Sequence, residues 1–219
     1  SGNVQLNNEN KISYKAPITD DWLNRKNTVF NALSDKDIKG IQYLNAEQIA
    51  NLSPQQLSFV SPSQIKGLST TQLSNLSTQQ LKALNNDQLA NLTPAQLTVF
   101  SDAQLSALTP EQWASLTENQ LSSLSNLQLN VIPPKAFAKF QESQLQSLTP
   151  AQLNALSTDI FLALNKTQLG CLTCNQLKSL KPQQMASLPL GVFKDLVKKK
   201  PDCMSAAQLA SLSPEQLQI

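Results

Sequence analysis

The sequence contains no histidine and little charge, so the residues that most often build active sites are scarce. Charged residues make up 15% of its 219 residues, and the net charge is +2. Histidine is the commonest general base and a common metal ligand. The five glycines form no phosphate-binding loop, and no GxSxG motif occurs. We therefore expect no catalytic residue, no metal and no cofactor, and the weak charge gives no reason to expect nucleic acid as a partner.

Long apolar stretches are also missing. None reaches the roughly 18 residues that a membrane-spanning helix needs, and the first residues lack the charged-then-apolar pattern of a secretion signal. We therefore expect membrane attachment only through an anchor outside this chain. The repeats described below stop at a repeat boundary without a divergent cap, so we expect the chain to be truncated at its C-terminus.

The sequence has only three cysteines, too few for a disulfide-rich scaffold, and they do not decide the compartment. Cys171 and Cys174 have CxxC spacing, but the βαβ context of a thioredoxin-like motif and the extra ligands of a zinc site are absent. Cys203 ends the most irregular segment of the chain. We predict a disulfide from Cys203 to Cys174, with Cys171 as the alternative partner, because either bond would tether that segment to a regular one.

What the sequence does contain is a repeat of eight residues that runs from Leu44 to Ile219 in 22 copies without an insertion or deletion. We call each copy an octad and number its positions from the leading apolar residue. Position 1 is apolar in all 22 copies and position 6 in 21, the exception being Pro201. One continuous helix or strand would scatter these residues over several faces. The chain must therefore bend once in every octad.

The other regular positions of the octad have the residues typical of a helix N-terminus. Position 2 is Ser, Thr or Asn in 17 copies, position 3 is Pro in eight, and position 5 is Gln in 18. With position 2 at the N-cap, Pro falls on the first helical residue and Gln on the third, which is a capping box. Positions 1 and 6 then form the hydrophobic staple. A glutamine also keeps an amide that can donate and accept hydrogen bonds between neighbouring octads.

This pattern predicts an all-α, superhelical solenoid over residues 44–219, with one short capped helix per octad. Helices this short do not persist alone in water, so they must stack on one another. Residues 1–43 are predicted to form an N-terminal arm, extended over residues 1–18, and an amphipathic capping helix that begins at Thr19. The side chains of this helix that repeat at helical spacing are Trp22, Lys26, Val29, Phe30 and Leu33.

Departures from the pattern are where a function other than packing is expected. Octads 132–139, 140–147 and 156–163 each lose the cap or the glutamine, and residues 188–203 lose both in two successive octads. The last of these segments carries the only basic cluster, which is the candidate interaction segment for an acidic partner and consists of Lys194, Lys198, Lys199 and Lys200. A solvated loop is the alternative reading of the same lysines.

Four asparagines begin an N-x-[S/T] sequon and are candidate N-glycosylation sites: Asn51, Asn75, Asn91 and Asn165. Three of them, Asn51, Asn75 and Asn91, stand at position 8. An asparagine there, followed by an apolar residue and a cap hydroxyl, creates a sequon from the repeat pattern alone. Genuine glycosylation and a coincidence of the repeat both remain open from the sequence.

The stretches LSPQQLSFVSPSQIKGL (52–68) and LTPEQWASL (108–116) resemble the repeats of the mesothelin, stereocilin and otoancorin family, and LPLGVF (188–193) has the same character. The resemblance extends over most of residues 44–219. It implies a glycosylated, often lipid-anchored superhelical protein that acts outside the cell in adhesion. The chain departs from this family in its lack of histidine, its low charge and its nearly perfect periodicity.

These observations favour a non-catalytic adhesive or structural domain, located outside the cell or on its surface, that binds a protein or glycan partner. The alternative is an intracellular scaffold or a secreted microbial effector that uses the same solenoid to bind a protein. The sequence names no ligand under either reading.

Overall fold

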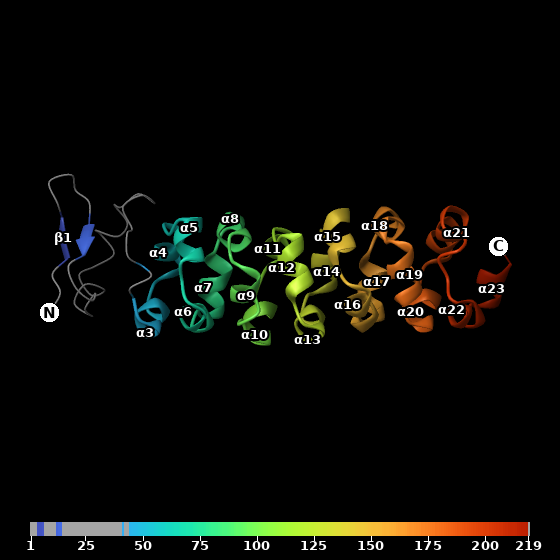
Figure 1. Cartoon of the computed structure of the whole chain (residues 1–219), viewed down its shortest axis with the longest axis horizontal. Helices are drawn as coiled ribbons and strands as arrows, with labels where there is room; N and C mark the ends of the chain where they lie inside the picture. The colour runs from blue at the N-terminus through green and yellow to red at the C-terminus, as the bar shows by residue number, and fades with distance from the viewer. Residues whose placement is uncertain (1–3, 7–11, 15–40, 42–43, 219) are drawn as a thin grey trace. The chain divides into compact units, whose positions relative to one another are not determined.

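The computed structural model describes residues 4–6, 12–14, 41 and 44–218. These residues form two short strands and 21 short α-helices in tandem (Figure 1). The predicted all-α solenoid is confirmed. The predicted capping helix, with Trp22 and Phe30, lies outside the described residues. The chain divides into two compact units, Ser1–Leu108 and Thr109–Ile219, which are described separately.

The described residues of the first unit form both strands and eight helices. Strands β1 (Val4–Leu6) and β2 (Ile12–Tyr14) pair antiparallel, with Val4 opposite Tyr14. The sequence predicted an extended arm here but not the pairing of its two halves. The helices follow the octads and are α3 (Ala46–Ala50), α4 (Pro54–Ser58), α5 (Pro62–Lys66), α6 (Thr70–Ser74), α7 (Thr78–Ala83), α8 (Asn86–Ala90), α9 (Pro94–Leu97) and α10 (Asp102–Ser106).

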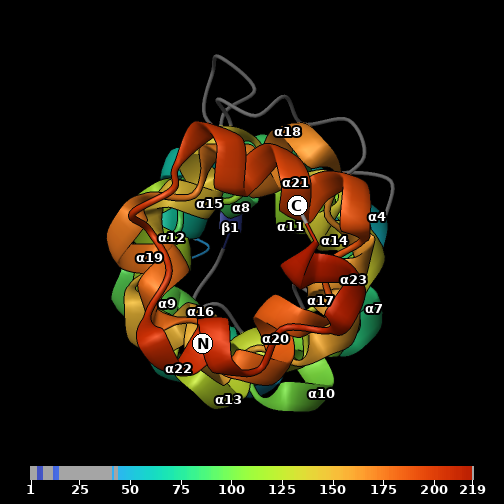
Figure 2. The same ribbon diagram turned by 90° about the vertical axis from the view of Figure 1, so that its right-hand side faces the viewer.

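The second unit contains the remaining helices among the described residues. Figure 2 shows the last of them, from α19 to α23, following one another around a ring when seen from the C-terminal end. The helices are α11 (Pro110–Ala114), α12 (Glu118–Ser123), α13 (Asn126–Asn130), α14 (Pro134–Phe137), α15 (Glu142–Ser147), α16 (Pro150–Ala155), α17 (Thr158–Ala163), α18 (Lys166–Cys171), α19 (Cys174–Ser179), α20 (Pro182–Ala186), α21 (Leu190–Lys199), α22 (Ala206–Ala210) and α23 (Pro214–Leu217).

Each regular helix begins with the predicted capping box. In α4, the Gln56 backbone N–H donates to the Ser53 hydroxyl at 3.1 Å, and the Ser53 backbone N–H donates to the Gln56 side-chain oxygen at 2.7 Å. Ser53 itself is extended, with φ −68° and ψ 153°, as an N-cap must be. The box satisfies two of the backbone N–H groups that every helix start leaves unpaired. It therefore restarts a helix in each octad.

The glutamine of the box also joins successive turns of the solenoid. The Gln80 side-chain amide donates to the carbonyls of Ile49, Ala50 and Leu52 at 2.9, 3.2 and 2.6 Å. These acceptors lie 31, 30 and 28 residues back in the chain. They lie at or just after the C-terminal end of a short helix, where the last carbonyls lack a helical partner, although the Ile49 carbonyl also accepts from the Leu52 backbone N–H at 3.1 Å. The oxygen of one side-chain amide thus caps the start of its own helix. The nitrogen of the same amide caps the end of a helix one turn earlier.

This bonding defines the length of a turn. A step of 28 residues equals three and a half octads, and in each unit a helix packs mainly against the third helix along, as α4 does on α7 and α16 on α19. The sequence predicted that glutamines link octads but placed the partners in neighbouring octads. The partners lie one full turn away, because the free carbonyls that accept the bonds are stacked there.

The core consists of the side chains at positions 1 and 6. From Leu44 to Leu196 they are between 0% and 6% exposed, and the largest fully buried ones are Trp113, Phe137, Phe161 and Phe193. Position-5 glutamines are buried with them, for example Gln88 at 0%. Leu209 and Leu217, at position 6 of the last octads, are 46% and 64% exposed. These two side chains are the most exposed position-6 leucines of the described octads.

Residues 188–203 depart from the predicted rule of one helix per octad. The two irregular octads share the single ten-residue helix α21, so 21 helices serve 22 octads. Position 2 of the second octad is Val197, which has no side-chain oxygen to cap a new helix start. Without that stop signal the helix continues, and Pro201 ends it instead of filling the core.

Candidate interaction surface

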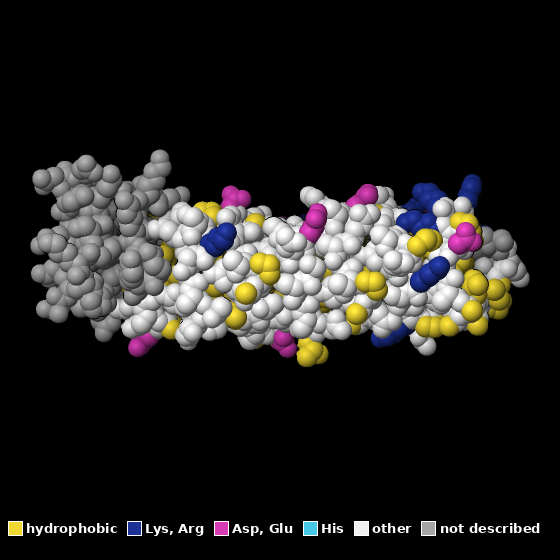
Figure 3. Space-filling model, in the orientation of Figure 1, with side chains coloured by type: hydrophobic (Ala, Val, Ile, Leu, Met, Phe, Trp, Pro, Cys, Tyr) yellow, Lys and Arg dark blue, Asp and Glu magenta, His cyan; other side chains and the backbone are white. Residues whose placement is uncertain are grey.

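The solenoid uses four positions of the octad for folding and leaves the other four at the surface. Positions 1 and 6 fill the core, position 5 is mostly buried, and position 2 caps the helix. Positions 3, 4, 7 and 8 carry mostly small or uncharged polar side chains. Figure 3 accordingly shows a face that is largely uncharged, with isolated acidic and apolar groups. The places where this uniform surface changes are therefore the candidate contact sites.

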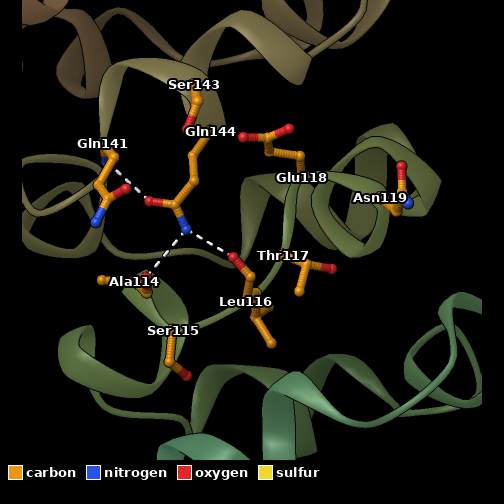
Figure 4. Close-up of a pocket in the computed structure, with 9 residues that line it drawn as sticks. All are labelled: Ala114, Ser115, Leu116, Thr117, Glu118, Asn119, Gln141, Ser143 and Gln144. Carbon is orange, nitrogen blue, oxygen red and sulfur yellow. Dashed lines mark hydrogen bonds between the residues drawn. The ribbon is translucent and has the colours of Figure 1, made fainter.

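One such place is a polar pocket in the second unit, between two stacked turns (Figure 4). Its volume is about 470 Å³, within the range of small-molecule sites. It adjoins octad 140–147, one of the irregular octads named above, whose position 2 is Gln141 instead of a small hydroxyl residue. The pocket is lined by Ala114, Ser115, Leu116, Thr117, Glu118, Asn119, Gln141, Ser143 and Gln144.

Much of the polar lining of this pocket is committed to the fold. The Gln144 amide donates to the carbonyls of Ala114 and Leu116 at 3.0 and 2.7 Å, as Figure 4 shows. The Ser115 hydroxyl donates to the Gln112 carbonyl at 2.7 Å, and the Thr117 hydroxyl caps α12. The pocket can offer a polar ligand the Glu118 carboxylate and nearby amide and hydroxyl groups. Sequence analysis missed it, because its width depends on how two turns stack.

A second place where the surface changes is the predicted interaction segment on α21. Lys194, Lys198 and Lys199 are exposed there, and dark blue side chains gather over α18 and α21 in Figure 3. Lys166 of α18 forms an ion pair with Asp195 of α21. On the other side of the helix, Phe193 and Leu196 are 1% and 6% exposed. The helix is therefore amphipathic, with its apolar side in the core and its lysines towards solvent.

Lys200 differs from the other three lysines of that segment. Its ammonium group donates to the Gly170 carbonyl at 2.8 Å and to the Leu172 carbonyl. These acceptors lie 30 and 28 residues back, as the acceptors of a position-5 glutamine do. Lys200 stands at position 5 and takes over the role of the missing glutamine. The expectation that all four lysines face a partner is therefore corrected for Lys200. The sequence contains the signal for this role, because Lys200 stands at the position that glutamine occupies in regular octads.

The cysteines lie at the same end of the second unit. A disulfide joins Cys174, the first residue of α19, to Cys203, with 4.7 Å between the Cα atoms. It ties the segment after α21 to the preceding turn. Cys171, the alternative partner, is free and partly buried. Burial, and then the charge of Glu142, raise the pKa of the Cys171 thiol. This thiol therefore stays protonated at neutral pH.

The structure places all four sequon asparagines on the surface. The Asn75 and Asn91 side-chain amides donate to the carbonyls of Thr71 and Asp87, at 2.8 and 2.9 Å, in the preceding helical turn. Asn165 is an N-cap, whose side-chain oxygen accepts from the Gln168 backbone N–H at 2.9 Å. These local bonds give three of the asparagines a role in the fold, and exposure leaves all four within reach of modification.

The described residues contain no group of three or more histidine, cysteine, aspartate or glutamate side chains placed to hold a metal ion. Among the same residues, no helix has both the length and the apolar character needed to cross a membrane.

The chain is a repeat protein of short helices, defined by its capped octads and by the glutamine hydrogen bonds that join successive turns. The usual role of this class is interaction. The model of the ALTTAQ repeat matches residues 61–94 and 83–118. The letters LTTAQ of that name have the apolar residue, cap hydroxyl and glutamine of octad positions 1, 2 and 5. The match thus indicates a protein of short repeats, and it gives no link to the mesothelin, stereocilin and otoancorin family. No curated protein matches the chain.

Proposed function

We propose that the chain is a non-catalytic binding domain of an extracellular or cell-surface protein, in which the solenoid holds contact residues at fixed positions for a protein or glycan partner. The observation that carries the proposal is the Cys174–Cys203 disulfide. Disulfides form and persist outside the cell and are rare in reducing compartments. The likeness of the octads to mesothelin-type repeats supports the same location, and the exposed sequon asparagines fit it.

The non-catalytic part of the proposal rests on composition. The sequence has no histidine, and the carboxylates at positions 3 and 4 lie in the first turn of their helices, where the helix dipole favours them. In Glu111, for example, its own backbone N–H, and then the Lys139 side chain, lower the pKa. A carboxylate held in this way is a poor general base. A binding role needs no such group.

The test is the chemical state of the protein isolated from its native source. Under the proposal, thiol titration without reductant finds one free thiol per chain, that of Cys171. Digestion followed by mass spectrometry finds the Cys174–Cys203 peptide, and an endoglycosidase lowers the mass of the chain. Three free thiols and no glycan would contradict an extracellular location.

An intracellular scaffold is the second candidate, and Cys171 is the observation that favours it. A free thiol that stays reduced is ordinary in a reducing compartment. In that case the native protein has all three cysteines reduced, and chemical cross-linking in living cells joins it to a cytosolic protein. The first measurement therefore separates the two candidates before any ligand is known.

A further inference from the structure

The positive charge of the chain is concentrated at α21. The exposed lysines Lys194, Lys198 and Lys199, together with Lys166 of α18, form what we call the α21 basic face. With Lys200 and the two nearby acids, Asp195 and Asp202, the region holds five lysines and two aspartates, a net charge of +3. The whole chain carries +2, so the remainder carries −1 (2 − 3). Outside this region the described residues hold six lysines and eight aspartates or glutamates, so α21 carries the largest gathering of positive charge in the described part of the chain.

We propose that the α21 basic face binds an acidic polysaccharide. The proposal rests on the extracellular location proposed above, because sulfated and carboxylated glycans are polyanions of that compartment. Lys194 and Lys198 lie one helical turn apart, about 6 Å along the axis, with Lys199 beside them towards α18. A chain of sugars with an anionic group on each repeating unit can meet several of these ammonium groups at once.

The packing of α21 argues against a membrane as the partner. A helix that lies on a bilayer buries its apolar face among the lipids. The apolar side of α21 is already used, since Phe193 and Leu196 are 1% and 6% exposed. Leu190, at 39% exposed, is the one large apolar side chain that this helix offers to solvent. Contact with α21 is therefore electrostatic, without an inserted anchor.

The two recesses described at α21 are too small to seat a side chain of an acidic protein segment. Protein partners gain most of their affinity from anchor side chains in well-formed pockets. The two recesses found at α21 have volumes of only about 10 Å³ each, too small for a side chain. A flexible polyanion needs no such pocket, because its affinity comes from many charge contacts spread over an open face.

The fold holds the basic face in place before any ligand arrives. The Cys174–Cys203 disulfide ties down the chain just after α21, and Lys200 fixes the end of the helix to the carbonyls of Gly170 and Leu172. The Lys166–Asp195 ion pair joins α18 to the middle of the helix. A pre-organised surface loses less conformational freedom on binding. These three links explain how lysine side chains on one short helix can act together.

The experiment compares the oxidised full chain with two variants on immobilised heparin, uncharged dextran, polyglutamate and vesicles that contain phosphatidylserine. The test variant is Lys194→Gln/Lys198→Gln/Lys199→Gln, which leaves Lys200 and the Lys166–Asp195 pair intact. The control variant is Lys66→Gln/Lys135→Gln/Lys178→Gln, which removes the same charge from exposed lysines on other helices. Circular dichroism melts verify that both variants are folded.

We expect the chain to bind heparin, and the affinity of the test variant to be lower by roughly tenfold while the control variant stays within about twofold of the unmodified chain. Binding should disappear as the Debye length falls from about 10 Å at 0.1 M salt to about 3 Å at 1 M. Equal losses in both variants, or no binding to heparin, overturn the proposal. Stronger binding to vesicles or polyglutamate overturns it in favour of a membrane or an acidic protein. The disulfide and the glycan of the native protein are measured separately, so a failure here leaves the extracellular location standing.

Discussion

At the scale of single residues, the position-5 glutamine explains why the repeat uses an amide where many capping boxes use glutamate. Its oxygen accepts from the N-cap backbone, which a carboxylate could also do. Its nitrogen donates to carbonyls one turn away, and a carboxylate has no hydrogen to donate. Glutamate would place a negative oxygen against those carbonyls in a buried site. The second bond, which links turns, is therefore what selects glutamine.

The substitution Gln80→Glu tests this explanation, because Gln80 is 2% exposed and bonds three carbonyls. We expect the free energy of unfolding, measured by urea denaturation at pH 7, to fall by about 1–3 kcal/mol. The matched control is Gln79→Glu, one residue earlier in the same helix and exposed, which should change it by less than about 0.5 kcal/mol. If the two variants are equally stable, the inter-turn bond contributes nothing.

At the scale of a helix, α21 shows how two octads stay folded in the solenoid without an N-cap hydroxyl and without a position-5 glutamine. Its two octads lack both the cap and the glutamine, yet Phe193 and Leu196 still fill the core. The helix gains length, ten residues in place of four to six, which compensates for missing caps because a longer helix leaves a smaller share of its backbone groups unpaired. Lys200 then supplies the donor to the previous turn that glutamine supplies elsewhere.

A pair of substitutions at Lys200 tests that assignment. Lys200→Met keeps an apolar stem of similar reach but removes the donor, and we expect it to lower the free energy of unfolding by about 1 kcal/mol. Lys200→Gln restores the residue of a regular octad and should lose much less. Both variants remove the same charge, so a common loss would mean that charge, and not hydrogen bonding, is what Lys200 provides. Urea denaturation of the oxidised protein measures the difference.

The sequence predicted the elements well because the information for each helix is local. Ser53, Pro54 and Gln56 lie within four residues of one another and specify a helix start wherever they occur. The turn of 28 residues could not be predicted, since it depends on the angle at which successive helices meet, and a strictly periodic sequence reads the same at every spacing of whole octads. The pocket near Gln141 could not be predicted for the same reason. The role of Lys200 was predictable in principle, from its position in the octad.

At the scale of the whole molecule, stability in a repeat protein is a sum over repeats and over the contacts between adjacent turns. Position-5 glutamines in different octads bond equivalent carbonyls, at position 1 and at position 6 or 7, as both Gln80 and Gln176 do. Removing a whole octad therefore brings a chemically equivalent position opposite every glutamine. Removing half an octad brings another glutamine opposite it instead.

This leads to a prediction in which the larger deletion does less damage. Deletion of the octad 76–83 should leave a cooperatively unfolding protein with unchanged helix content per residue and a free energy of unfolding lower by about 1 kcal/mol, the share of one octad. Deletion of only residues 78–81 shifts the octads of the following turn by half a repeat against the turn before them, because their bonds reach 28 residues back across the deletion. It should lower the stability by several kcal/mol, because buried glutamines lose their acceptors and leucines lose their facing partners. Circular dichroism and urea denaturation of the two deletion variants, measured side by side, test the prediction. If the half-octad deletion is as stable as the deletion of a whole octad, the bonds across 28 residues do not set the register of the solenoid.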